Sequence, residues 1–107
     1  MKKIYIGKNF SETPVGRYLS DGPYSGEKFR EEILHPALKE NDIVSVVIDD
    51  AEGYGSSFLD EAFGGLVRKK YFTAAELEKK LSIECTKPDY LFYRVLIWKY
   101  IKEAQPA

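Results

Sequence analysis

Several features are scarce in this sequence, and each scarcity excludes some classes of structure or function. Its one cysteine, Cys85, cannot close an internal disulfide, which favours a reducing compartment. No segment approaches the roughly 18 apolar residues of a membrane span, and the start MKKIYIGKNF lacks an apolar stretch of signal-peptide length. A net charge of -1 offers no electrostatic attraction to nucleic acid or to an anionic membrane. We therefore expect a cytoplasmic protein that binds neither.

Side chains typical of catalysis and metal binding are scarce as well. The single histidine, His35, stands directly before a proline, and no other residue is an obvious base for a serine or for Cys85. The run from Gly53 to Phe58 begins like a dinucleotide-binding loop but lacks the third glycine. We expect no metal, no cofactor and no enzymatic activity. The acids nearby are typical of a solvated surface rather than a metal site: Asp49, Asp50, Glu52, Asp60 and Glu61.

What is present is sufficient for one α/β domain over residues 1–107. The hydrophobic content is 44%, and no repeat or linker divides the chain. Residues 43–48 are nearly all apolar and β-branched, which is typical of a central strand covered on both faces. Residues 2–7, 16–19 and 82–85 are candidate strands, because they alternate or are bounded by glycine and proline.

Apolar residues at helical spacing predict helices between and after these strands. The first begins after Ser25, a suitable N-cap, and the pair His35-Pro36 is expected to kink it or end it early. The second ends near Lys70, a short third follows the capping box Thr73–Glu76, and the last covers 90–103. This alternation implies a small mixed, mainly parallel sheet with helices packed on it.

The loop between the central strand and the second helix is the first candidate site. Sites in open α/β sheets gather beyond the carboxyl ends of strands, and the free N–H groups of a helix start favour anions. If Ser57 is the N-cap, Asp60 stands at the third helical position, as a capping pattern requires. Ser57 is then occupied with backbone hydrogen bonds, and the Ser56 hydroxyl is freer. The alternative is that both serines merely cap the helix.

The second candidate site is the stretch from Gly16 to Arg30. Arg17 and Arg30 offer forked donors suited to a carboxylate or a phosphate, and Ser25 opens a helix start. One interpretation is contact with a polar ligand or a phosphoserine. The other is a well-capped turn with two surface arginines, and the residues alone leave both open.

At these two stretches the sequence resembles a bacterial STAS-like family of unknown function, over roughly residues 4 to 70. The matching segments are Gly16-Arg17-Tyr18, Asp21-Gly22-Pro23, Ser25-Gly26-Glu27, Phe29-Arg30 and the run GSSFLDEAFG from Gly55 to Gly64. The resemblance implies a STAS-like fold and brings no settled activity with it.

That family is similar, more distantly, to STAS domains such as anti-anti-sigma factors. There the central strand leads to an Asp-Ser-Ser-Gly-Leu segment at a helix start, where a serine is phosphorylated by a partner kinase that also binds nucleotide. By position, the resemblance implies that Ser56 is this serine, with Ser57 as the alternative. The sequence departs from the segment at Gly55, where the aspartate is replaced, and at Phe58, where the glycine is replaced.

Two hypotheses of function follow, besides a purely structural adaptor. The first is a regulatory module that docks a protein partner, such as a histidine-kinase-like ATPase, through residues 49–61 and is switched at Ser56. A phosphate there would be repelled by Asp60 and Glu61 but held by the helix start. The second is a domain or enzyme that binds an anion or nucleotide. The residues expected to contact a partner or ligand are Arg17, Tyr18, Asp21, Ser25, Arg30, Asp49, Tyr54, Gly55, Asp60 and Glu61.

Overall fold

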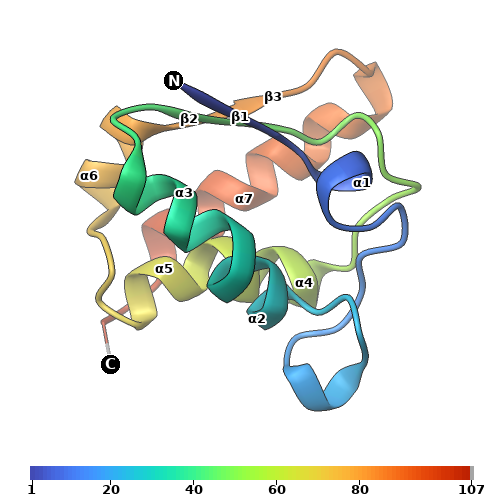
Figure 1. Cartoon of the computed structure of the whole chain (residues 1–107), viewed down its shortest axis with the longest axis horizontal. Helices are drawn as coiled ribbons and strands as arrows, with labels where there is room; N and C mark the ends of the chain where they lie inside the picture. The colour runs from blue at the N-terminus through green and yellow to red at the C-terminus, as the bar shows by residue number, and fades with distance from the viewer. Residues whose placement is uncertain (107) are drawn as a thin grey trace.

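A computed structural model describes residues 1–106 of the chain. Within them the strands β1 (Lys2–Tyr5), β2 (Val44–Val47) and β3 (Leu81–Glu84) form a parallel sheet in the order β1-β2-β3 (Figure 1). Ile4 of β1 pairs with Val46, which in turn pairs with Ile83 of β3. The expected α/β class and the central place of β2 are confirmed, and each of these strand pairs is parallel.

The helices lie on one face of this sheet (Figure 1). Val46 is fully buried and points to that face, whereas its neighbours Ser45 and Val47 point to the other, because alternate residues of a strand face opposite ways. On that second face, an ion pair of 3.2 Å between Lys3 Nζ and Glu84 Oε2 runs from β1 to β3 across β2. All four residues of β2 are buried, as predicted for a strand covered on both faces, but among the described residues no helix packs on this second face. Side chains of the flanking strands are enough to bury β2.

The first long helix runs without a break over residues 26–40. It is made of α2 (Gly26–Phe29), a π-helical turn η2 (Arg30–Leu34) and α3 (His35–Glu40). Ser25 is its N-cap, as predicted, and its Oγ accepts a hydrogen bond from Lys28 N. Pro36 does not end the helix. The turn before it widens so that His35 N–H donates to Arg30 O, five residues back, which accommodates a proline in the next position.

The second long helix covers residues 56–68 and also contains a π-helical turn. Its parts are α4 (Ser56–Leu59), η3 (Asp60–Gly64) and α5 (Gly65–Arg68). It ends in a Schellman motif, in which Tyr71 N donates to Leu66 O and Lys70 N donates to Val67 O. Lys70 takes the left-handed position of this motif with φ 63°, where glycine is usual.

The remaining elements are short, apart from the last helix. They are α1 (Ile6–Asn9), the 3-10 turn η1 (Leu19–Asp21), α6 (Ala74–Lys80), the 3-10 turn η4 (Pro88–Tyr90) and α7 (Leu91–Glu103). The capping box of α6 and the span of α7 agree with prediction. Residues 16–19 do not form a strand, because Gly16 O and Arg17 O accept hydrogen bonds from the first residues of α2. The first strand ends at Tyr5, and the chain turns directly into α1.

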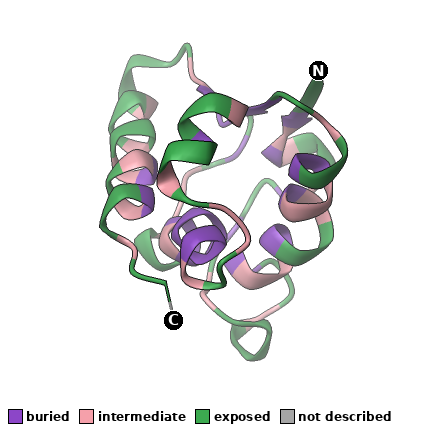
Figure 2. Ribbon diagram, turned by 90° about the vertical axis from the view of Figure 1, so that its left-hand side faces the viewer, coloured by how far each residue is buried: buried purple, intermediate pink, exposed green. Residues whose placement is uncertain are grey.

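The core lies between the sheet and the helices. Figure 2 shows buried positions on the inward faces of the helices and along the strands. Phe29, Phe58 and Phe63 meet at its centre, with ring centroids of Phe29 and Phe58 5.9 Å apart and those of Phe29 and Phe63 6.2 Å apart. No helix within residues 1–106 combines the length and the apolar character needed to cross a membrane.

Candidate functional site

The two stretches singled out in the sequence lie against each other, because α2 crosses α4 at a glycine (Figure 1). A Cβ on Gly26 would stand 2.5 Å from Phe58 O and 3.0 Å from Ala62 N, so only glycine permits this approach. Arg17, in the loop before α2, then reaches the helix after Ser56. Its Nη1 donates to Asp60 Oδ2 at 2.8 Å and to Glu61 Oε1 at 3.3 Å.

Arg30 makes the second link between the two long helices. Its side chain is fully buried, and Nη1 donates to Glu61 O and Glu61 Oε2, both at 2.7 Å. Its Nε donates to Glu31 Oε2 at 2.7 Å. A side chain at Gly65 would collide with this guanidinium, which explains why a glycine is tolerated inside that helix. An arginine in such surroundings holds two helices in register.

Arg68 completes a network in which three arginines meet three carboxylates. Its Nη1 and Nη2 donate to Asp60 Oδ1 and Asp60 O, both at 3.0 Å. Burial alone would raise the pKa of Asp60, but the hydrogen bonds from Arg17 and Arg68 outweigh it, so this pKa lies below its ordinary value. The network of Arg17, Arg30, Arg68, Glu31, Asp60 and Glu61 is therefore balanced in charge.

This network changes the interpretation of several predicted site residues. Arg30 is not a surface arginine, and neither Arg30 nor Glu61 presents its charge to an incoming molecule. Ser25 is also fully buried and is occupied as a helix cap. Arg17 and Asp60 keep partial exposure, with 30% and 23% of their side chains accessible. A ligand cradle built from both arginines is thus already filled by carboxylates of the protein itself.

The two serines of α4 are exposed side by side at the helix start. The N-cap is Gly55, not Ser57, and no side-chain hydrogen bond caps this helix. The predicted capping pattern from Ser57 to Asp60 is wrong, because the carboxylate of Asp60 is held by Arg17 and Arg68. Neither serine hydroxyl has a hydrogen bond to another residue among those described.

The aspartates after β2 are fixed by the loops of the neighbouring strands. Asp49 accepts hydrogen bonds from the backbone N–H groups of Thr86 and Lys87, and Asp50 accepts from those of Gly7 and Lys8. Burial alone would raise the pKa of Asp49, but these N–H groups lower it. The pair therefore ties helix α1 and the loop after β3 to the end of β2. No three His, Cys, Asp or Glu side chains within residues 1–106 gather as a metal site would require.

Tyr54 and Cys85 lie beside these aspartates. The Tyr54 hydroxyl donates to Ile48 O at 2.8 Å, and its ring packs edge-on against Tyr90 and Tyr93. Burial, followed by the charge of Asp50, raises the pKa of Tyr54. Burial and the neighbouring Asp49 raise the pKa of the Cys85 thiol, which disfavours the reactive thiolate.

The sequence analysis named Tyr18 and Asp21 but missed the apolar character of the tip of the loop before α2. This loop projects from the body of the molecule (Figure 1) and is closed by a hydrogen bond from Val15 N to Tyr24 O. Four large side chains on it are exposed: Val15 by 62%, Tyr18 by 51%, Leu19 by 58% and Tyr24 by 41%. Asp21 folds the tip by accepting from Arg17 N and Tyr18 N. The clue available in the sequence was a set of aromatic and aliphatic residues that stand between turn-forming residues.

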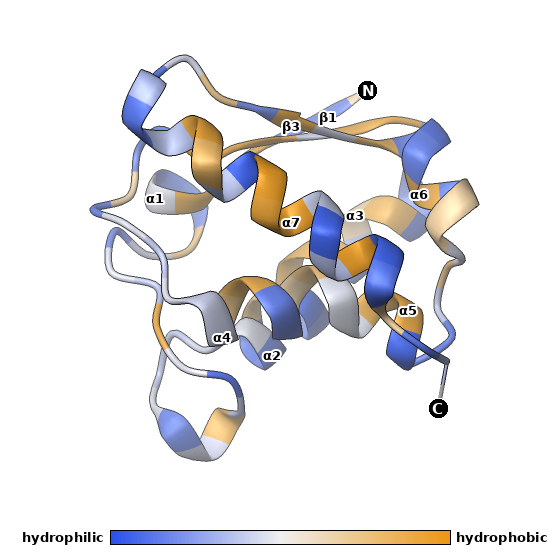
Figure 3. Ribbon diagram, turned by 180° about the vertical axis from the view of Figure 1, so that it is seen from behind, coloured by the Kyte–Doolittle hydropathy of each residue, from blue (hydrophilic) through white to orange (hydrophobic). Residues whose placement is uncertain are grey.

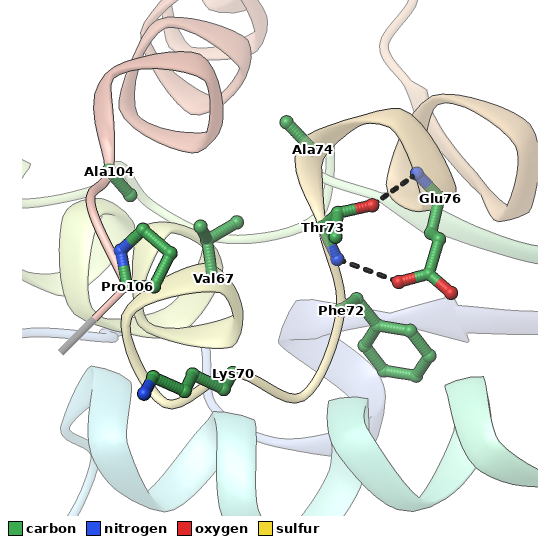
Figure 4. Close-up of a pocket in the computed structure, with 8 residues that line it drawn as sticks. All are labelled: Val67, Lys70, Phe72, Thr73, Ala74, Glu76, Ala104 and Pro106. Carbon is green, nitrogen blue, oxygen red and sulfur yellow. Dashed lines mark hydrogen bonds between the residues drawn. The ribbon is translucent and has the colours of Figure 1, made fainter.

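A largely apolar pocket of about 440 Å³ lies at the C-terminal end of the second long helix, residues 56–68 (Figure 4). Two of its polar residues are engaged with each other, since Thr73 Oγ1 accepts from Glu76 N and Thr73 N donates to Glu76 Oε1. The residues around it are Val67, Lys70, Phe72, Thr73, Ala74, Glu76, Ala104 and Pro106. None of the predicted site residues lines it. The candidate site remains the start of α4 and the adjacent loop, residues 15–24.

Comparison with known proteins gives one match. The model of a family described as a STAS-like domain of unknown function (DUF4325) matches residues 25–91. The matched region contains α2, β2, the serines of α4 and β3, but not the apolar loop tip or most of α7. No curated protein and no solved structure matches the chain.

Proposed function

The chain belongs to the family of STAS-like domains of unknown function, and from this premise we propose that it is a regulatory protein-interaction module. It docks a protein partner with the start of α4 and the apolar loop, residues 15–24, and phosphorylation of Ser56 or Ser57 switches the docking. The proposed partner is a histidine-kinase-like ATPase, which supplies the phosphate. The module acts through binding and carries no catalytic centre of its own.

The observation that supports this proposal most is the state of the two serine hydroxyls. Both are exposed at the first positions of a long helix, and neither is used to cap it. The free N–H groups of such a helix start stabilise a phosphate by hydrogen bonds and by the helix dipole. Phosphorylation there therefore adds about −1.5 to −2 charges without breaking an existing hydrogen bond.

The arginine network removes the expected repulsion of this phosphate. Asp60 lies four residues after Ser56 and three after Ser57, so it shares their helix face. Its charge is compensated by Arg17 and Arg68. Arg17 is partly exposed and can exchange Asp60 for a phosphate oxygen. The switch would then reach the apolar loop directly, because Arg17 belongs to it.

The experiment maps phosphate and measures docking with the same variants. The protein is incubated with ATP and an extract of its native host, and phosphate is located by mass spectrometry. Capture of host proteins is then compared for the wild type, Ser56→Asp, Ser57→Asp and Ser82→Asp. Ser82 is an exposed serine of β3, outside both docking segments, and serves as the matched control.

We expect phosphate on Ser56 or Ser57, and at least an approximately tenfold change in capture of an ATPase for the corresponding aspartate variant. Ser82→Asp should leave capture unchanged, and all variants should unfold at the wild-type temperature. The proposal is contradicted if neither serine carries phosphate and neither aspartate variant changes the capture of host proteins. The ligand-binding alternative receives less support from the geometry, because Arg30, one of the two guanidinium groups it needs, is buried against Glu61.

A further inference from the structure

The last helix, α7, carries apolar residues along its length (Figure 3), and several of their side chains are exposed. Leu91, Phe92 and Val95 are exposed by 41%, 62% and 66%, and Trp98 beside them is half-buried. Leu91, Val95 and Trp98 follow one another at i, i+4 and i+7, so they lie along one side of the helix. The core uses the opposite side, where Ile97 and Ile101 are fully buried. Of this apolar stripe, Leu91, Phe92 and Val95 are therefore left over from the packing of this chain, whereas Trp98 packs partly against its core.

Three cations border the stripe. Arg94 lies on one side, Lys99 on the other, and Lys102 continues the line of Leu91 and Val95 by one further turn. None of the three lies within ion-pair distance of a carboxylate among residues 1–106. The other three arginines of the chain all bind carboxylates in the network described above. The positive charge around α7 is therefore available to a partner.

The surface around Trp98 is also hollowed. A groove of about 420 Å³ follows α7 and is lined by Arg94, Val95, Trp98, Lys99 and Lys102. A second hollow of about 300 Å³ lies between α7 and α6, where Trp98 and Lys102 face Glu78. Trp98 thus stands as an aromatic ridge between two depressions. This relief suits the side chains of a helix, which alternate between ridges and grooves.

We propose that α7 docks an amphipathic helix of a partner protein whose polar positions are acidic. The apolar side of that helix covers Leu91, Phe92, Val95 and Trp98, and its carboxylates pair with Arg94, Lys99 and Lys102. Helix recognition by anchors at this spacing is a recurring mode, and opposite charges around the anchors fix orientation and specificity. The proposal concerns a surface separate from the serines and does not rest on the proposed switch.

The charges and the shape of the α7 surface favour an acidic helix over two other occupants. A second copy docked face to face would bring Arg94, Lys99 and Lys102 against the same cations, which is repulsive. An anionic bilayer would satisfy the charges, but it presents a flat surface that leaves the depressions on either side of Trp98 empty. A folded acidic helix satisfies the charges and fills the grooves.

The test uses Trp98 as its own reporter, because it is the only tryptophan in the chain. The full chain is titrated with a synthetic helical peptide of about 18 residues, five turns, with leucines along one face and glutamates elsewhere. The matched peptide carries lysines in place of the glutamates. The protein variants are Val95→Glu and, as control, Val15→Glu, which changes a valine of similar exposure on the remote loop. A third variant carries both Lys99→Glu and Lys102→Glu, which reverses the charge along the border of the stripe.

We expect saturable change of Trp98 emission with the glutamate peptide and binding at least about tenfold weaker for the lysine peptide and for Val95→Glu. Val15→Glu should bind like the wild type, rising salt should weaken binding, and the charge-reversed variant should prefer the lysine peptide. Equal binding of both peptides, or none, overturns the proposal. So does a dimer in sedimentation that Val95→Glu dissociates, or a shift of Trp98 emission only with vesicles containing anionic lipid.

Discussion

Ser25 and Ser57 stand near the starts of the two long helices, and only Ser25 caps its helix. Ser25 accepts a hydrogen bond from Lys28 N and is fully buried, whereas Ser57 is exposed and caps nothing. We therefore predict that Ser25→Ala lowers the free energy of unfolding by about 0.5–2 kcal/mol, the usual effect of losing an N-cap. Ser57→Ala should change it by less than about 0.5 kcal/mol. Urea unfolding of both variants measures the difference.

Ser56→Ala provides the control for this comparison, since it removes a neighbouring hydroxyl that is also exposed. Equal losses for Ser25→Ala and Ser57→Ala would show that the serine caps α4 in solution. In that case its hydroxyl would not be free to accept a phosphate. The stability measurement thus bears on the proposed function before any partner is known.

At the scale of elements, the arginine network joins the two long helices and makes their packing sensitive to acid. The pKa of Asp60 is lowered in the folded protein, so its contribution to stability is complete above its ordinary value near 3.8. That contribution is lost as the pH falls through the lowered pKa, where the folded state must also take up the proton. Asp60→Asn imitates the protonated form at every pH.

We predict that Asp60→Asn destabilises the protein by about 1–2 kcal/mol at neutral pH, as expected for hydrogen bonds to a charged, partly buried group. The difference from the wild type should shrink below about pH 4 and approach zero in stronger acid. His35, whose pKa is lowered chiefly by burial, titrates in both proteins and cancels from the difference. Asp42→Asn, at an exposed aspartate outside the network, is the control. A difference that stays constant down to pH 2 would show that the hydrogen bonds of Asp60 do not depend on its charge.

The elements themselves were largely predictable, because local patterns determine them. The β-branched run of β2, the cap at Ser25 and the box at Thr73 each have a local cause that the sequence displays. The loop at 16–19 was mistaken for a strand because its hydrogen bonds go to Gly26 and Glu27 of the next helix. Short apolar runs do not distinguish strand from ordered loop without such partners.

The residues of the candidate site could be predicted from the sequence, but their roles could not. Arg17 and Arg30 were correctly noticed as unusual, but apart from Glu31, which follows Arg30 directly, their carboxylate partners lie more than thirty residues away in sequence. A guanidinium that binds a ligand and one that binds a distant glutamate have the same local sequence. Only the approach of α2 to α4 at Gly26 decides between them.

At the scale of the whole molecule, the helices within residues 1–106 cover one face of the sheet only, and adjacent valines of β2 report on the two faces. Val46 is fully buried under the helices, while Val47 is 8% exposed beside the ion pair of Lys3 and Glu84. We predict that Val46→Ala lowers the free energy of unfolding by about 2–3 kcal/mol, from two lost methyl groups and the cavity left in a rigid core. Val47→Ala should lower it by less than about 1 kcal/mol, because flexible neighbouring side chains can close over the gap. Urea unfolding of the two variants tests this on the same strand with the same substitution. Equal losses would show that something covers the second face in solution, and that β2 is a two-sided strand as its apolar sequence first indicated.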